Sequence, residues 1–201
     1  MGDTQAVEPP AALCERLERL LPPGALAGWW EAFRGQPLTG FRVNLLKAQP
    51  AQVLPELAAA EIAVAPLSWY PLGFTVAAAD RRRLTETAAV AAGSLYIQNA
   101  SSMLPPLLLD PRVGERVLDL AAAPGGKTLQ LAAQMGDGGQ LAAVESVRGR
   151  FFRLRRNLEA GGAAGVQTYL RDGGTVWRDC PERFDRILLD APCSGDGGLN
   201  C

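Results

Sequence analysis

Residues 118–128 read Leu-Asp-Leu-Ala-Ala-Ala-Pro-Gly-Gly-Lys-Thr, a glycine-rich loop set between a short apolar run and a helical pattern. The apolar run, residues 116–120, predicts a strand, and residues 126–135 predict a helix. Glycine lets the backbone approach a ligand closely, and the amino end of a helix favours negative charge. We therefore interpret this stretch as a ligand-binding loop between a strand and a helix.

The rhythm of strand, loop and helix continues downstream. Residues 140–144 predict a strand, residues 148–160 a helix, and residues 166–170 and 187–190 two more strands. Strands that alternate with long helices form a parallel sheet, which binds ligands at the carboxyl ends of its strands. The predicted fold class is therefore α/β, with a Rossmann-like sheet in residues 93–201.

Residues 1–92 are expected to form a small α+β N-terminal domain with a linker, which could contact RNA. The leucines of residues 13–21 fall on one helical face, and Pro22 stops that helix. In residues 41–45 the apolar side chains alternate with Arg42 and Asn44. This alternation predicts a strand that offers those two polar side chains to solvent or to a ligand.

Two further expectations concern local structure in this N-terminal part. A helix near residues 52–60 should begin late enough to place Pro55 in its first turn, because an interior proline costs about 3 kcal/mol. Residues 69–73, Trp-Tyr-Pro-Leu-Gly, are expected to form a turn with exposed aromatic side chains. Arg81 to Arg83 are interpreted as the start of a solvated helix.

Composition excludes several classes of mechanism. The 201 residues contain no histidine, which rules out a Ser-His-Asp triad, a Cys-His pair and a histidine-based zinc site. Catalysis must therefore use carboxylates, lysine or thiols. The four cysteines show no Cys-x-x-Cys spacing, and no run of 18 apolar residues or signal peptide is recognisable. We expect a reduced, cytoplasmic protein without a membrane segment or a metal site.

Three interpretations compete for the glycine-rich loop. A P-loop is matched at Gly126, Lys127 and Thr128, but Ala121 stands where its first glycine belongs, and Pro124 removes an amide donor. The dinucleotide pattern Gly-x-Gly-x-x-Gly is not matched. A loop for S-adenosyl-L-methionine tolerates alanine and proline, because this cofactor has no pyrophosphate and needs fewer backbone donors.

Two acids support the third interpretation. Glu145 follows Gly125 by 20 residues and ends the next predicted strand, where an acid can hold both hydroxyls of a ribose. Asp172 ends the third strand and could accept a hydrogen bond from an adenine amino group. Taken alone, Glu145 is equally explained as an exposed acid that starts a helix turn, and Asp172 is better explained as a turn aspartate.

The most specific motif is Asp-Ala-Pro-Cys-Ser-Gly at residues 190–195, after the fourth predicted strand. A thiolate that adds to carbon 6 of a pyrimidine makes carbon 5 nucleophilic toward a methyl sulfonium. Asp190 could bond the ring nitrogen and the amino group and stabilise the charge that develops there. The alternative for Cys193 is a small buried apolar side chain, and the other three cysteines keep that interpretation.

Together, residues 118–128 and Leu-Asp-Ala-Pro-Cys-Ser-Gly at 189–195 closely resemble the NOL1/NOP2/Sun family of RNA cytosine-5 methyltransferases, especially its bacterial ribosomal RNA enzymes. Arg-Val-Asn at 42–44 and residues 96–105 are similar to upstream motifs of that family. The resemblance implies a Rossmann-like S-adenosylmethionine-dependent methyltransferase sheet, S-adenosyl-L-methionine as cofactor, and RNA, in particular ribosomal RNA, as partner. It also implies a monomer for the full-length protein.

The family roles carry over to matching positions. The residues implied to bind the cofactor are Ala122, Ala123, Pro124, Gly125, Gly126, Lys127, Glu145, Arg150, Asp172 and Asp190. Lys127 and Asp190 would also hold the target cytosine. Cys193 matches the family's first motif cysteine, which helps to release the product.

The family's nucleophilic cysteine belongs to a Thr-Cys-Ser-like motif after the next strand, and residues 1–201 do not contain it. The sheet is accordingly expected to stop after its fourth strand, and the 201 residues to be inactive alone. A non-catalytic module that binds cofactor or RNA and a nucleotide hydrolase remain alternatives. An RNA face could include Arg42, Arg81 to Arg83 and the arginines of residues 148–156, although solvated arginines explain each equally well.

Overall fold

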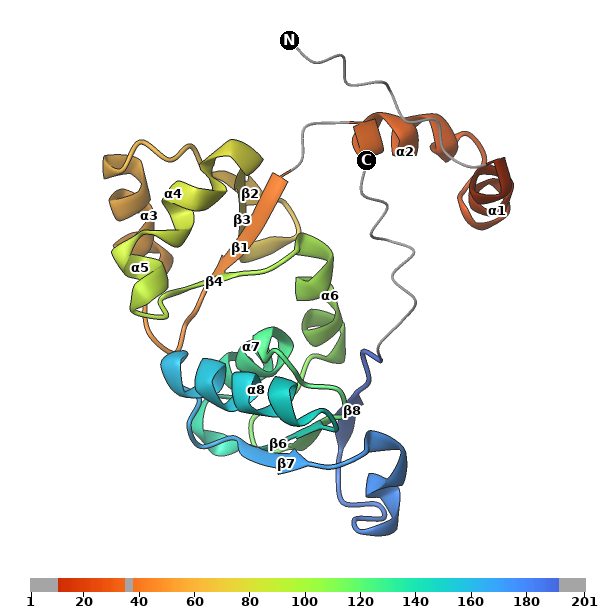
Figure 1. Ribbon diagram of the computed structural model, residues 1–201, viewed down its shortest axis with the longest axis vertical. Helices are drawn as coiled ribbons and strands as arrows, with labels where there is room; N and C mark the ends of the chain where they lie inside the picture. The colour runs from red at the N-terminus through yellow and green to blue at the C-terminus, as the bar shows by residue number, and fades with distance from the viewer. Residues whose placement is uncertain (1–10, 35–37, 192–201) are drawn as a thin grey trace. The chain divides into compact units, whose positions relative to one another are not determined.

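The computed structural model describes residues 11–34 and 38–191, without the side chains of 32–34, and divides the chain into two compact units (Figure 1). The described part of the smaller unit consists of α1 (Ala11–Leu20) and α2 (Ala25–Arg34). Helix α1 confirms the amphipathic helix predicted near residues 13–21, and it ends just before Pro22. Residues 38–192 form the larger unit, which carries both sheets.

The first sheet of the larger unit is antiparallel, with strand order β2-β3-β1-β4. Phe41 and Val43 of its central strand are fully buried, and they pack with Leu57 and Leu84 from the helices on that face. The elements of this layer are β1 (Leu38–Val43), α3 (Pro50–Ala59), β2 (Ala65–Leu67), β3 (Tyr70–Ala77), η1 (Ala78–Asp80), α4 (Arg81–Thr85), α5 (Ala88–Ala91) and β4 (Leu95–Ile97).

One local prediction for this layer was wrong, and another was confirmed only in part. Helix α3 begins at Pro50, which takes the first helical position that proline favours, so Pro55 lies inside the helix. Burial of Val53 and Leu57 in the core outweighs the hydrogen bond that Pro55 cannot donate. The turn predicted over residues 69–73 is confirmed only at Trp69, which is exposed and lies in the turn Ser68–Trp69; Tyr70 already begins β3 and is buried. The helix start expected at Arg81 is confirmed.

The second sheet is parallel, as predicted, and its strand order is β7-β6-β5-β8. Helices α7 and α8 have the bounds that the sequence pattern predicts. The elements of this layer are α6 (Ala100–Leu109), β5 (Arg116–Asp119), α7 (Gly126–Met135), η2 (Gly136–Gly138), β6 (Gln140–Glu145), α8 (Arg148–Ala160), β7 (Gln167–Leu170), η3 (Gly173–Arg178) and β8 (Arg186–Leu188).

Successive side chains of β5 pack on opposite faces of the parallel sheet, because a strand alternates its side chains. Val117 packs with Leu131 and Met135 of α7, whereas Leu118 packs on the other face with Val176 of η3. Helices α7 and α8 therefore cover one face, and η3 covers part of the other (Figure 1). Both faces of the central strands are buried, which explains the continuous apolar runs in the sequence.

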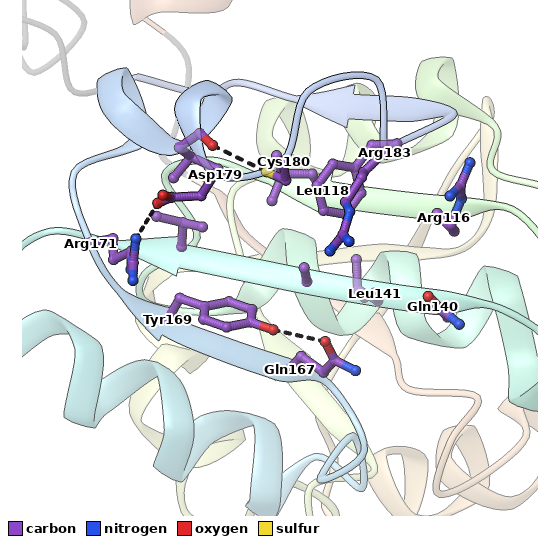
Figure 2. Close-up of a pocket in the computed structure, with 14 residues that line it drawn as sticks. Arg116, Leu118, Gln140, Leu141, Gln167, Tyr169, Arg171, Asp179, Cys180 and Arg183 are labelled. Carbon is purple, nitrogen blue, oxygen red and sulfur yellow. Dashed lines mark hydrogen bonds and ion pairs between the residues drawn. The ribbon is translucent and has the colours of Figure 1, made fainter.

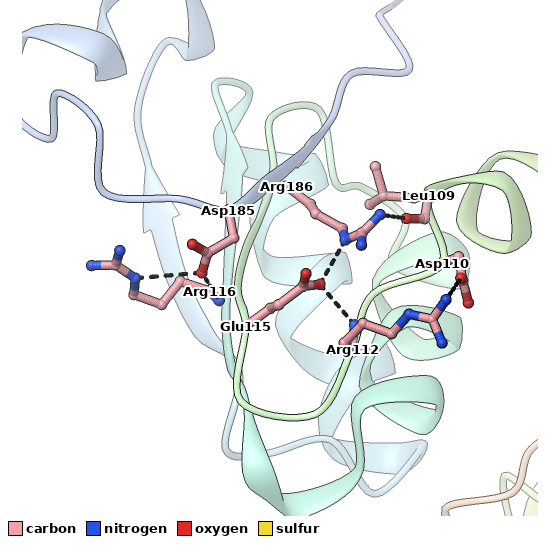
Figure 3. Close-up of polar contacts among 7 residues, drawn as sticks. All are labelled: Leu109, Asp110, Arg112, Glu115, Arg116, Asp185 and Arg186. Carbon is pink, nitrogen blue, oxygen red and sulfur yellow. Dashed lines mark hydrogen bonds and ion pairs between the residues drawn. The ribbon is translucent and has the colours of Figure 1, made fainter.

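Arginine and acid pairs tie β8 to β5 at the amino-terminal edge of the parallel sheet (Figure 3). The Nε atom of Arg186 lies 2.6 Å from Glu115, and its Nη1 donates to the carbonyl of Leu109 over 2.6 Å. Asp185 accepts from the backbone amide of Arg116 over 2.7 Å. These contacts hold the edge strand in register and leave the carboxyl edge of the sheet to the candidate site.

Strand β4 lies after the domain boundary predicted at residues 92 and 93, yet it pairs with β1 of the antiparallel sheet. The first sheet therefore extends past that point, and the division of the chain at residue 92 stays a prediction. Within the described ranges, 11–34 and 38–191, no helix is long and apolar enough to cross a membrane.

Candidate functional site

The glycine-rich loop joins the end of β5 to the start of α7. Gly125 caps α7 with a φ of 108°, a left-handed conformation that glycine adopts without steric cost. A Cβ atom at Gly126 would lie 2.6 Å from the ring of Tyr96, so glycine is also needed for close packing there. No side chain caps the first turn of α7, which leaves amide donors at the loop for a ligand.

Helix α8 holds the loop through two consecutive carbonyl groups. Arg150 Nη2 donates to the carbonyl of Ala123 over 2.9 Å, and Asn157 Nδ2 donates to that of Pro124 over 2.8 Å. The resemblance implied that Arg150 backs the site, whereas Asn157 was missed. Its position two helical turns after Arg150 places both side chains on one face of α8, a spacing that could have identified it.

Arg42 supports the loop from the antiparallel sheet. Its guanidinium is buried, donates to the carbonyl of Gly126 over 2.9 Å and to Gln98 over 3.2 Å, and lies over the ring of Tyr96. Burial lowers the pKa of Arg42 to about 10, so the side chain stays charged at neutral pH. The predictions that Arg42 faces solvent or a ligand and belongs to an RNA face were therefore wrong.

Asn44 lies on the same face of β1 as Arg42 and is also buried. Its Nδ2 donates to the carbonyls of Gly93 and Gly161, each over 2.8 Å. The polar face of β1 is turned toward the parallel-sheet layer, and the polar groups on that face are satisfied by main-chain carbonyls. Alternation along a strand shows which residues share a face, but not what covers it.

Glu145 ends β6 and is only 3% exposed. One carboxylate oxygen accepts from the amide of Val147 over 2.8 Å, and the other lies 3.6 Å from Arg150 Nε. A buried carboxylate held in this way is a fixed acceptor pair for two neighbouring hydroxyls. Arg150 therefore connects Glu145 to the loop carbonyl of Ala123.

Asp172 follows β7, beside the end of β6, because Glu145 and Leu170 are partners in the sheet register. Its side chain accepts from the amide of Gly174 over 2.9 Å and caps η3. The carboxylate thus has the turn-forming role that was kept as the alternative. It is exposed and lies at the same carboxyl edge as Glu145.

Lys127 and Asp190 form an ion pair of 2.6 Å across the carboxyl ends of the central strands. Lys127 lies in the first turn of α7 and is mostly buried, whereas Asp190 follows β8 and is half exposed. The two residues expected to hold the same target are therefore adjacent. Pro192 to Cys201 lie outside the described residues, and with them the predicted Cys193.

Asp119 is a functional candidate that sequence reasoning missed. It ends β5, is buried, and accepts from the Thr128 hydroxyl over 2.7 Å. Burial raises the pKa of its carboxyl from 3.8 to about 6, although Thr128, the Ala121 amide and Lys127 oppose that shift. Asp119 lies beside the Lys127–Asp190 pair and adds negative charge where the glycine-rich loop leaves β5.

A cavity of 510 Å³ lies elsewhere, on the face of the parallel sheet that carries η3 (Figure 2). Leu118, Tyr169, Cys180 and Arg183 are among its lining residues, and none of the residues predicted to bind the cofactor lines it. Cys180 donates to the carbonyl of Val176 over 3.1 Å, so it has a structural contact there. The cavity is separate from the candidate site.

Comparison with known proteins assigns the chain to a family. The profile described as 16S rRNA methyltransferase RsmB/F matches residues 106–200. Ribosomal RNA small subunit methyltransferase F of Erwinia tasmaniensis is 38% identical over 202 residues, covering 98% of this chain and 42% of that protein. The chain belongs to the RsmB/F family of ribosomal RNA methyltransferases. This finding confirms the resemblance to the Sun-type enzymes.

Other relatives support the assignment of the chain to the RsmB/F family. The protein of the same name from Salmonella paratyphi B is 41% identical over 160 residues, covering 78% of the chain and 33% of that protein. The chain thus spans less than half the length of these two curated relatives. A methyltransferase homolog from Pyrococcus horikoshii superposes with a TM-score of 0.77 at 33% identity, covering 94% of this chain and 65% of that one.

The structure of NSun6 from Pyrococcus horikoshii superposes with a TM-score of 0.76 over 92% of this chain and 71% of that one. At 18% identity this likeness concerns the fold alone. Together with the parallel sheet, these structures confirm the predicted Rossmann-like S-adenosylmethionine-dependent methyltransferase fold. S-Adenosyl-L-methionine is accordingly the cofactor of the family.

Proposed function

We propose that the chain supplies the cofactor site of an S-adenosyl-L-methionine-dependent methyltransferase that acts on carbon 5 of cytosine in ribosomal RNA. One observation carries this proposal: a buried carboxylate, Glu145, is linked through Arg150 to the loop that begins α7. Family membership supports ribosomal RNA as the substrate. The choice of carbon 5 of cytosine as the methyl acceptor rests on the motif at residues 190–195.

The residues at the carboxyl edge fit the chemistry of this cofactor. Glu145 presents a fixed carboxylate for the ribose hydroxyls, and the uncapped first turn of α7 suits the carboxylate of the amino-acid end. Ala122 to Gly126 would line that end, and Asp172 would receive the adenine amino group. The P-loop interpretation is weaker, because the loop has no Gly at position 121 and Pro124 has no amide proton.

When bound, the cofactor supplies a methyl group activated by a sulfonium. The chain's own residues would orient the acceptor base. The Asp190 carboxyl would bond the ring nitrogen and amino group of cytosine, and Lys127 would hold the same base after its ion pair with Asp190 opens. The family match gives Cys193 a role in releasing the methylated product. The nucleophile is proposed to come from a motif that residues 1–201 do not contain.

Equilibrium dialysis with labelled S-adenosyl-L-methionine tests the cofactor site. We expect S-adenosylhomocysteine to displace the label and ATP with magnesium to leave it bound. If ATP with magnesium displaced the label and S-adenosylhomocysteine did not, the loop would be a nucleotide site and the proposal would be overturned. With the same labelled cofactor and unmodified ribosomal RNA, residues 1–201 should incorporate no methyl group, and cytosine-specific turnover would contradict the proposed need for a second motif.

A further inference from the structure

The outer face of α8 is strongly basic. Residues 148–156 contain five arginines and no acid, in a chain whose net charge is −1. One of the five, Arg150, faces the cofactor loop, whereas the other four are exposed. We call Arg148, Phe152, Arg155 and Arg156 the α8 outer face, because their spacing of three, four and eight positions places them on one side of the helix.

The arginines of this face have no acidic partner among the residues that the structure describes. Elsewhere, exposed arginines such as Arg82, Arg116 and Arg171 pair with Glu86, Asp185 and Asp179. No carboxylate of the described residues forms an ion pair with any of the three arginines of the α8 outer face. The only acid of the helix, Glu159, lies near its end. The positive charge on this face is therefore available to a polyanion.

An aromatic ring lies among the arginines of the α8 outer face. Phe152 is 51% exposed, and the guanidinium of Arg148 lies 5.8 Å from the centre of its ring. Exposure of a phenylalanine has a cost in water, which a stacking partner would remove. Cations that track a phosphate backbone, interleaved with an aromatic ring on which a base stacks, are the features of a site for single-stranded nucleic acid.

The same helix connects this surface to the cofactor site. Arg150 and Asn157 on the opposite side of α8 hold the carbonyls of Ala123 and Pro124. A strand bound to the outer face would therefore lie only one helix diameter, about 10 Å, from the cofactor loop. From this arrangement we propose that the α8 outer face binds an unpaired segment of the RNA substrate, with phosphates on its arginines and a base on Phe152. This inference rests on the proposed function.

Fluorescence anisotropy with a labelled single-stranded fragment of small-subunit ribosomal RNA tests the charge component. The triple variant Arg148→Gln, Arg155→Gln, Arg156→Gln should bind about tenfold or more weakly at 0.1 M salt. Its slope of log affinity against log salt should fall by about 2, since each phosphate contact contributes about 0.7. The matched control, Arg81→Gln, Arg82→Gln, Arg83→Gln, removes the same charge from α4. Arg82 and Arg83 already pair with Glu86 and Asp80, so this variant should change affinity less than threefold.

The Phe152→Ala variant tests the stacking component separately. Affinity should fall about fivefold or more at every salt concentration with an unchanged salt slope, because stacking releases no counterions. Equal losses for the α8 and α4 triple variants would show a global charge effect and overturn the proposal. An α8 triple variant that retains RNA affinity but loses binding to anionic lipid vesicles would overturn it in favour of a membrane contact.

Cofactor binding distinguishes this inference from the proposed function. The α8 triple variant should retain the wild-type affinity for S-adenosylhomocysteine, because its three arginines do not contact the loop. If the wild-type chain binds S-adenosylhomocysteine and the RNA results fail, only the α8 inference is lost. If the wild-type chain binds no S-adenosylhomocysteine, the proposed function fails, whatever the RNA results are.

Discussion

The Nη2 atom of Arg42 donates to the carbonyl oxygen of Gly126 over 2.9 Å, so a side chain of the antiparallel sheet holds the first residue of α7. The two residues are 84 positions apart in the chain. The same guanidinium bonds Gln98, which in turn donates to the carbonyl of Ser102 in α6. The antiparallel layer is therefore part of the support of the glycine-rich loop.

Replacement of Arg42 should affect the cofactor through that support. Arg42→Met keeps most of the side-chain volume but removes the donors to Gly126 and Gln98. We expect the binding free energy for S-adenosylhomocysteine to weaken by about 0.5 to 2 kcal/mol, the range typical of coupling through packed contacts. Calorimetric titration measures this loss. Arg81→Met, an exposed change of the same charge, is the control, and equal affinities of the two variants would contradict the positioning role.

Glu145 should contribute to cofactor binding directly. Glu145→Gln keeps an acceptor for the amide of Val147 but loses one of the two charged oxygens that would bind the ribose hydroxyls. The expected loss is about 1 to 3 kcal/mol in binding free energy, the cost of stranding a buried polar partner. Equilibrium dialysis measures the loss, with Glu159→Gln on the exposed side of α8 as control. Unchanged binding by Glu145→Gln would exclude the ribose contact.

Asp119 should make stability depend on pH. Because burial raises its pKa from 3.8 to about 6, the native state binds the proton more tightly than the unfolded state. The contribution of Asp119 to the free energy of unfolding is therefore most favourable below pH 3.8, and it declines as the pH rises to about 6. Relative to wild type, Asp119→Asn should gain stability with rising pH, by up to about 3 kcal/mol between pH 4 and 7.

Urea denaturation at several pH values checks this expectation, since the difference between the two proteins isolates the titration of Asp119. Asp137→Asn, which removes an exposed acid, serves as the control for loss of one charge. A constant difference between Asp119→Asn and wild type from pH 4 to 7 would show that Asp119 is not the titrating group.

The contact between Arg186 and Glu115 should make stability depend on pH in the direction opposite to that of Asp119. The hydrogen bond from Arg186 lowers the pKa of Glu115 below its usual 4.5, so its stabilisation is present above that pH and is lost as the pH falls. Arg186→Gln should lower the melting temperature at pH 7 by a few degrees, and the difference from wild type should shrink below about pH 4. Thermal melts followed by circular dichroism test both parts, and a difference that persists at low pH would refute the assignment.

Because β8 lies at an edge of the described sheet, we expect residues 1–201 to self-associate. Among the described strands β8 pairs only with β5, and the side chains of Ile187 and Leu189 beside its free edge are more than half exposed. Such an edge is a template for further strands, and a lysine there opposes pairing. Light scattering should show species larger than a monomer, and Ile187→Lys should reduce them. A monodisperse wild-type monomer would argue against an adhesive edge.

The local pattern of the sequence predicted the four strands and the helices α7 and α8 of the parallel layer, but not α6. Helices α7 and α8 were predicted at their observed bounds, because amphipathic spacing and the glycines at 125 and 161 act within one helical turn. The carboxyl edge was predicted for the same reason, since parallel strands bring Glu145, Asp172 and Asp190 to one side of the sheet. The family motifs contributed Arg150 and Lys127, which no periodicity identifies.

Tertiary structure alone decided the burial of the polar residues. Alternation along β1 placed Arg42 and Asn44 on one face, but only the layer packed against that face turned them into donors to main-chain carbonyls of Gly126 and Gly161. Likewise, the raised pKa of Asp119 arises from burial that its sequence neighbours do not encode. Local periodicity determines which elements form, whereas the electrostatic character of each site residue depends on which distant segment removes its water.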